Sequence, residues 1–140
     1  MGKKQQYPRI RSIFIEVYFK GGIMGEEKNY ENKIKRWLQS KGIYALGSVY
    51  DPNKAIGYYE KRFGCSFTPS GLPDMHICIN GYSIEVELKA TNGRPSPLQL
   101  RCIEQINTSG GKALLLYPKN FEEFKEVIEC VIHLSSIYKQ

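Results

Sequence analysis

The sequence predicts one α/β domain whose elements follow the order helix, three strands, helix, strand, helix. Apolar residues recur at helical spacing in three separate segments. Asn80-Gly81, a dipeptide typical of tight hairpin turns, joins two short apolar stretches in the middle of the chain. A chain of 140 residues with 41% hydrophobic residues is also long enough to bury one core without disulfides. We therefore expect a single mixed domain.

The first half of the domain predicts a helix, a strand and a long connection. The helix covers residues 26–41 and ends at Gly42, which follows it as a C-cap. Residues 43–50 alternate loosely and predict a strand. Residues 51–70 are punctuated by glycine and proline, which is typical of a connection, and they contain an aromatic and basic patch at residues 58–63. The apolar stripe of the helix comprises Tyr30, Ile34, Trp37 and Leu38.

The second half predicts a hairpin, a helix, a strand and a final helix. Residues 75–79 and 82–90 are the expected hairpin strands. Ser96 is a typical N-cap, followed by a first-turn proline, and opens a helix that stops at a glycine pair. Residues 112–117 predict a short buried strand. A last amphipathic helix opens at Asn120, because a glutamate stands three residues later and apolar residues follow at helical spacing.

The net charge of +6 is concentrated at one end of the chain. Residues 1–23 hold five basic residues and one acidic residue, a net charge of +4. Met24 resembles a second natural chain start, so we expect the main domain to cover residues 24–140. Residues 1–23 are then a basic arm, an extra strand at residues 12–19, or an upstream in-frame extension. A basic excess suits a polyanionic partner.

Cysteine usage and hydropathy exclude two classes of protein. The cysteines lie far apart, with no C-x-x-C pair, which is typical of reduced thiols in an intracellular protein. The longest apolar runs are far shorter than the roughly 20 residues of a membrane span. We expect neither a disulfide framework nor a membrane protein. The cysteines are Cys65, Cys78, Cys102 and Cys130.

The hairpin turn predicts which residues face each other across the two strands. A two-residue turn at Asn80-Gly81 pairs residues whose numbers sum to 161. One face of the hairpin is then apolar, and the opposite face sets Asp74 against Glu87, with their Cβ atoms roughly 4.5 to 5.5 Å apart. Lys89 projects from that same face. Two facing carboxylates repel each other unless a cation lies between them.

Carboxylate oxygens are the ligands that Mg²⁺ takes in phosphoryl-transfer sites, where it keeps several waters. A lysine beside such a site can orient the attacking water and counter the developing negative charge. Asp74, Glu87 and Lys89 therefore predict a metal-assisted hydrolytic centre. The alternative is a solvated polar face on which these charges have no chemical role.

Three short motifs together resemble the VRR-NUC branch of the PD-(D/E)XK nucleases. They are Gly71-Leu72-Pro73-Asp74, Glu87-Leu88-Lys89 and Ser96-Pro97-Leu98-Gln99. The resemblance runs from about residue 31 to residue 117 and includes the expected element order. It implies a restriction-endonuclease-like core of helix, three strands, helix and strand, with an added C-terminal helix. It also implies that residues 24–140 form a nuclease domain of the phage or bacterial stand-alone type.

The resemblance assigns roles to five residues. Asp74 and Glu87 would be ligands of Mg²⁺ or Mn²⁺, and Lys89 the catalytic lysine. The family also places an acid on the first helix, which matches Glu31, with Glu27 as its competitor. Glu85 ranks second to Glu87 as a ligand and is a candidate partner of His76. The last of the five, Gln99, matches the family's helix glutamine, and its amide either contacts the substrate or caps a strand end.

Candidate nucleic-acid contacts are the cations on loops that flank this site, namely Lys54, Lys61, Arg62 and Arg94. The patch at residues 58–63 would either stack bases or anchor a loop in the core. The resemblance implies hydrolysis of DNA, branched DNA in particular, by a homodimer in the cytoplasm of a bacterial cell or a phage-infected host. The alternatives are a catalytically inactive nucleic-acid-binding module on the same fold and a structural or partner-binding protein.

Overall fold

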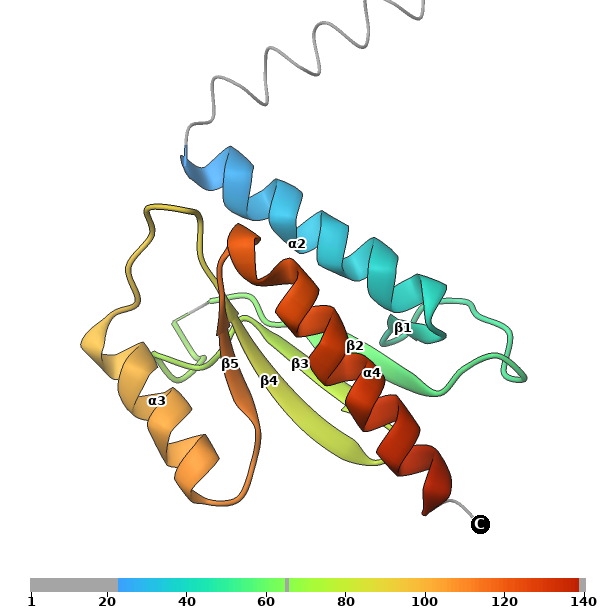
Figure 1. Cartoon of the computed structure of the whole chain (residues 1–140). Coiled ribbons are helices and arrows are strands. Elements are labelled where there is room, and N and C mark those ends of the chain that lie inside the picture. The colour runs from blue at the N-terminus through green and yellow to red at the C-terminus, as the bar shows by residue number, and fades with distance from the viewer. Residues whose placement is uncertain (1–22, 65, 139–140) are drawn as a thin grey trace, which may run out of the picture.

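The protein is a mixed α/β domain, as expected (Figure 1). The computed structural model describes residues 23–64 and 66–138, so the expected extension at residues 1–23 lies almost wholly outside the described residues, as does Cys65. The elements are α2 (Ile23–Ser40), β1 (Ile43–Ala45), β2 (Gly57–Lys61), β3 (Met75–Ile79), β4 (Tyr82–Leu88), α3 (Pro97–Thr108), β5 (Ala113–Leu116), the one-turn 3-10 helix η1 (Pro118–Asn120) and α4 (Phe121–Ile137). None of the helices in these ranges is long and apolar enough to span a membrane.

The strands form one mixed sheet in the order β1-β2-β3-β4-β5. The three central strands run antiparallel to one another, as β2 with β3 and β3 with β4, whereas each edge strand runs parallel to the strand beside it. The carboxyl ends of β2, β4 and β5 therefore lie at the same end of the sheet as the amino end of β3. This end of the sheet carries the residues of the candidate site.

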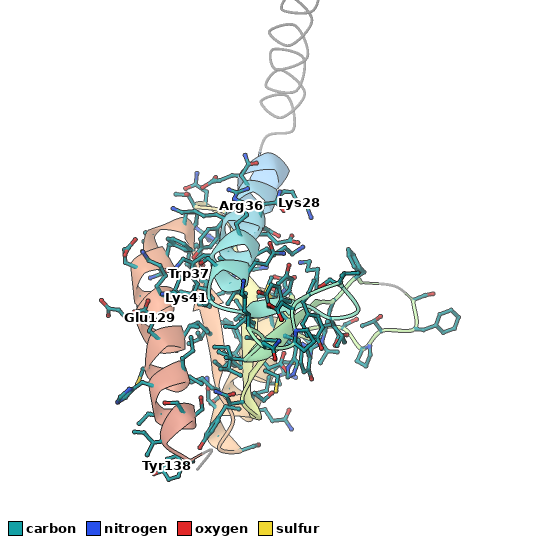
Figure 2. All side chains as sticks on the ribbon, turned by 90° about the vertical axis from the view of Figure 1, so that its right-hand side faces the viewer. Lys28, Arg36, Trp37, Lys41, Glu129 and Tyr138 are labelled. Atoms are coloured by element: carbon teal, nitrogen blue, oxygen red, sulfur yellow. The ribbon has the colours of Figure 1, made fainter. Side chains whose placement is uncertain are left out.

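Helices α2 and α4 lie side by side over one face of the sheet (Figure 1). Trp37 of α2 meets Phe121 and Phe124 of α4 edge-on, with ring centroids 6.4 and 5.8 Å apart. Figure 2 shows Trp37 and Lys41 directed toward α4, where Lys41 pairs with Glu129 at 2.9 Å. The core beneath is formed by Tyr30, Ile34, Leu38, Met75, Ile77, Ile79, Ile84, Val86, Leu88 and Ile128. Helix α3 lies apart from these helices and buries no residue fully.

The hairpin register is confirmed. Strands β3 and β4 pair Met75 with Val86 and Ile77 with Ile84, so paired numbers sum to 161. The turn works because Asn80 and Gly81 both adopt positive φ, at 49° and 90°, as a tight hairpin turn requires. The four apolar residues of these pairs are buried, as predicted.

The predicted connection at residues 51–70 is wrong in one respect, because it contains strand β2. Gly57 begins this strand where a Cβ atom would lie 2.1 Å from the carbonyl oxygen of Cys78, so the close approach of two backbones requires glycine here. The predicted strand at residues 43–50 is also too long. It ends at Ala45, since the chain turns at Gly47, whose φ is +80°.

The aromatic and basic patch is divided between the core and the surface. Tyr59 belongs to the core and is 4% exposed, whereas Phe63 is 76% exposed. Tyr58 lies against the ring of His76, with centroids 6.0 Å apart. The patch is therefore mostly strand β2, with Tyr59 in the core and Phe63 exposed beyond the end of the strand.

Candidate functional site

Asp74 lies between strands β2 and β4 at the end of the sheet that carries the candidate site. It directly precedes β3, and its carbonyl oxygen accepts a hydrogen bond from the Arg62 amide at 2.8 Å, which extends the ladder with β2. On the other side, Asp74 Oδ2 accepts a hydrogen bond from the Leu88 amide at 2.8 Å. Its second carboxylate oxygen, Oδ1, stands 3.7 Å from Lys61 Nζ.

Glu87 is a buried carboxylate, only 1% exposed, on the second-last residue of strand β4. Its Oε1 atom accepts hydrogen bonds from Lys89 Nζ at 2.6 Å and from Gln99 Nε2 at 2.5 Å. Its Oε2 atom is buried and has no hydrogen-bond partner among the described residues. Burial raises the pKa of Glu87, and the negative charge of Asp74 raises it further, although the hydrogen bond from Lys89 acts in the opposite direction.

These residues fit a divalent cation. A buried polar atom without a partner costs free energy, roughly 1 to 3 kcal/mol, and a cation at Oε2 of Glu87 would remove that cost. The like charges of Asp74 and Glu87 would then attract a shared ligand instead of repelling each other. No group of three histidine, cysteine or acidic side chains converges within the described residues. A site with two carboxylates and bound waters suits Mg²⁺ or Mn²⁺.

Glu31 lies near this cluster, but its carboxylate forms ion pairs with three lysines. It is 5% exposed, and its carboxylate contacts Lys35 at 2.5 Å and Lys28 at 3.2 Å, while Lys61 stands 3.7 Å away. Burial alone would raise the pKa of Glu31, but the hydrogen bonds from Lys35 and Lys28 and the charge of Lys61 hold it below its ordinary value. Its competitor Glu27 acts on Glu87 directly, since its charge raises the pKa of Glu87.

Lys61 joins the first helix to the hairpin. Its Nζ atom stands 3.7 Å from Asp74 Oδ1 and 3.7 Å from Glu31 Oε2, and its side chain is 18% exposed. The residue was expected to contact a nucleic-acid backbone, whereas here it lies between two carboxylates. Sequence reasoning missed this role because β2 was not recognised. The tyrosine pair Tyr58-Tyr59 was the signal that could have indicated a strand, because aromatic residues favour strands.

Arg62 and His76 both bind Glu85, which explains why Glu85 is not free for a metal. Arg62 donates two hydrogen bonds to this carboxylate, one of them from Nη2 to Oε1 at 3.0 Å, and a third to the Pro73 carbonyl at 3.1 Å. His76 Nδ1 lies 2.7 Å from Glu85 Oε1. The pairing of Glu85 with His76 is confirmed. The guanidinium of Arg62, another expected phosphate contact, is occupied by Glu85 and the loop before β3.

Gln99 has a role that neither sequence-based alternative described. Its backbone and side chain complete a capping box with Ser96, so Ser96 is a helix cap as expected. Gln99 Oε1 accepts from the Ser96 amide at 2.8 Å, which leaves Nε2 to donate to Glu87. The amide group is fixed by the helix start and orients the buried carboxylate.

The two remaining expected contacts lie in different places. Arg94 lines an open pocket that follows β4, close to Lys89. Lys54 belongs to the connection between β1 and β2, its side chain is 75% exposed, and it lies beyond the end of β2 opposite to Lys61. Arg94 therefore belongs to the turn that follows Lys89, where a Cβ on the adjacent Gly93 would lie 3.4 Å from Lys89 Cβ, whereas Lys54 belongs to a different loop. No protein-family model and no curated protein matches this chain.

Proposed function

We propose that this protein is a metal-dependent nuclease of the PD-(D/E)XK type that hydrolyses phosphodiester bonds of DNA with Mg²⁺ or Mn²⁺. The observation that carries the proposal is the Oε2 atom of Glu87, which is buried and has no hydrogen-bond partner in the described part of the chain, beside the like charge of Asp74 and the ammonium group of Lys89. A carboxylate in this state is poorly stabilised without a cation.

Each residue of the cluster has a part in the proposed reaction. Asp74 and Glu87 hold the cation, which when bound polarises the phosphoryl group and makes its water more acidic. Lys89 orients the attacking water and counters charge that develops on the phosphate. Gln99 keeps Glu87 in one orientation through its hydrogen bond to Oε1. Because these side chains come from strands and a capped helix start, little reorganisation is needed.

The element order supports the same proposal. Four strands lie between α2 and α3, where three were expected; the succession of helix, three strands, helix and strand fits when β2 to β4 are the three and β1, the expected first strand, is an extra edge strand, with α4 as the added helix. The motif with Asp74, Glu87 and Lys89 lies at the amino end of β3 and the carboxyl end of β4. The resemblance in sequence extends the proposal to branched DNA and to a homodimer.

The test compares metal binding with DNA cutting in matched variants. Asp74→Asn and Lys89→Met should each abolish Mg²⁺-dependent cutting of labelled branched, flapped and linear DNA. Glu104→Gln, an exposed acid on α3, should cut like the wild type. Circular dichroism checks that each variant is folded. Full cutting by a folded Asp74→Asn variant would overturn the proposal.

Calorimetry with Mn²⁺ distinguishes the nuclease from an inactive module on the same fold. The wild type should bind Mn²⁺, and Asp74→Asn should bind it at least tenfold more weakly. A wild-type protein that binds DNA but no Mn²⁺ would instead be a nucleic-acid-binding module.

A further inference from the structure

An open pocket of about 550 Å³ lies next to the proposed metal site. Residues 91–94, which follow β4, and residues 117–119, which follow β5, line it. These two strands are parallel neighbours, and the Lys89 amide donates to the Leu116 carbonyl at 2.9 Å where they end. The lining begins two residues after Lys89, a backbone span of at most roughly 7 Å. The pocket therefore adjoins the lysine of the proposed reaction.

Two cations from different segments line this pocket. Arg94 comes from the turn after β4, and Lys119 from the turn after β5; both are exposed. Within residues 23–64 and 66–138, neither forms an ion pair with a carboxylate. Like charges that share a pocket repel each other, and a bound anion reverses that effect. Arginine presents its donors in a fork that suits phosphate oxygens.

Contacts with neighbouring residues hold two other residues of the lining, Tyr117 and Thr91, in place. The ring of Tyr117 is half-buried, and Lys119 Nζ stands 5.9 Å from its centroid. A carboxylate also contacts the lining, because Glu26 Oε1 accepts hydrogen bonds from both the amide and the hydroxyl of Thr91, the first at 3.1 Å. These bonds tie the turn after β4 to helix α2. The carboxylate of Glu26 thus fixes the turn that carries Arg94.

We infer that this pocket binds a backbone phosphate of the nucleic-acid strand that is cut, with Arg94 and Lys119 as its ligands. The inference rests on the proposed function. Because the lining begins two residues after Lys89, we expect this phosphate to lie close to the scissile bond along the same strand. Contacts to phosphate set the position of a strand without reading its sequence. By binding a neighbouring phosphate, the pocket would position the strand so that the scissile phosphate lies at Asp74, Glu87 and Lys89.

The first test measures DNA affinity over a range of salt concentrations. The full chain is titrated onto fluorescent duplex DNA in buffer with EDTA, so that no cutting occurs. Arg94→Ala and Lys119→Ala should each weaken binding about five- to tenfold at low salt and lower the slope of log affinity against log salt by about 0.9. The double variant should lose no more slope than either single one, because both cations contact the same phosphate. Lys41→Ala, at an exposed lysine that pairs with Glu129 of α4, is the control and should bind like the wild type.

The second test locates the phosphate along the strand. A series of duplexes carries one uncharged methylphosphonate linkage at successive positions around the cut site. The wild type should lose affinity at one position within about two nucleotides of the cut, and Arg94→Ala should lose nothing further there. An equal loss in both proteins at every position would overturn the inference.

The outcomes separate this inference from the proposed function. Wild-type binding and salt slope in the Arg94→Ala and Lys119→Ala variants, with cutting still abolished by Asp74→Asn, would overturn the pocket and leave the nuclease standing. Reduced slopes in a protein that never cuts DNA would support the phosphate site and overturn the nuclease. Failure of the wild type to bind DNA at any salt concentration would overturn both.

Discussion

Gln99 Nε2 donates a hydrogen bond of 2.5 Å to Oε1 of Glu87, and the other oxygen of that carboxylate has no hydrogen-bond partner among the described residues. Helix α3 thereby orients a buried acid on β4, although α3 itself contributes no buried residue to the core. Helix α3 therefore contributes more to the candidate site than to the buried core. Its first turn carries both the capping box and the side chain that orients Glu87.

Replacing Gln99 should weaken metal binding while the fold is kept. Gln99→Ala removes the donor that holds Glu87, and loss of such a supporting contact typically lowers metal affinity about 10- to 100-fold. It also removes half of the capping box, which costs roughly 0.5 to 2 kcal/mol of stability. Mn²⁺ calorimetry and thermal melting measure the two effects separately.

Ser96→Ala is the matched control for Gln99→Ala. It removes the cap but keeps the contact between Gln99 and Glu87, so it should lower the melting temperature without changing Mn²⁺ affinity. Equal loss of affinity in both variants would assign the effect to the helix start and not to the amide.

The hairpin could be predicted from sequence because its register depends on local residues alone. Asn80 and Gly81 adopt the positive φ values of a tight turn, and alternate residues then follow the burial pattern of the two strands. The relation of Asp74 to Glu87 is a consequence of that register. Local chemistry was sufficient for this part of the site.

The rest of the site depends on contacts between distant segments, which local patterns do not contain. Strand β2 was missed because glycine and proline punctuate its surroundings, and Gly57 is needed for the approach of Cys78 on a neighbouring strand. Lys61 could not be placed between Glu31 and Asp74 without the order of the sheet and the path of α2. Cations on segments that flank the site therefore predicted phosphate contacts, whereas Lys61 and Arg62 form ion pairs in the folded chain.

Removing the charge of Lys61 should tighten metal binding and destabilise the metal-free protein. Lys61 Nζ stands 3.7 Å from carboxylate oxygens of both Asp74 and Glu31, so it repels a divalent cation and partly neutralises the two acids. We expect Lys61→Met to raise Mn²⁺ affinity about three- to tenfold, which corresponds to roughly 0.7 to 1.4 kcal/mol. Its metal-free melting temperature should fall.

Lys28→Met is the control for Lys61→Met. Lys28 also contacts Glu31, at 3.2 Å, but is 51% exposed and forms no ion pair with Asp74 among the described residues. Its Mn²⁺ affinity should match that of the wild type. A drop in affinity for Lys61→Met would show that this ammonium helps to hold the site together.

Glu87→Gln should make the metal-free protein more stable near neutral pH. Burial and the charge of Asp74 raise the pKa of Glu87, so the folded state holds this proton more tightly than the unfolded chain. The corresponding stability is fully present below the ordinary pKa of 4.5 and is lost as pH rises through the folded-state value. Glutamine carries no charge and should remove this loss, as melting curves between pH 4 and pH 8 would measure.

Added Mn²⁺ should reverse the order of stability of wild type and Glu87→Gln. A ligand that binds only the folded state raises stability with its concentration, and only the wild type keeps the carboxylate. The wild type should therefore gain melting temperature with Mn²⁺, and the variant should gain little. Equal gains in both proteins would place the metal elsewhere.

Tyr30→Phe should leave the protein at least as stable at neutral pH and more stable in alkali. The hydroxyl of Tyr30 is buried and has no hydrogen-bond partner within residues 23–64 and 66–138, so its removal relieves a desolvation cost of about 1 kcal/mol and keeps the ring contact with Phe121. Burial raises the pKa of Tyr30 from 10.0 to about 12. The unfolded chain therefore releases this proton first, and the associated stability is lost as pH rises from about 10 to about 12.

Denaturant unfolding of both proteins from pH 8 to pH 11.5 measures the effect of Tyr30. The difference in unfolding free energy between Tyr30→Phe and wild type should widen above pH 10, because lysine titration affects both proteins alike. Tyr82→Phe, at a residue 47% exposed, is the control and should follow the wild type throughout. A difference that stays constant with pH would mean that the Tyr30 hydroxyl reaches water in the folded protein.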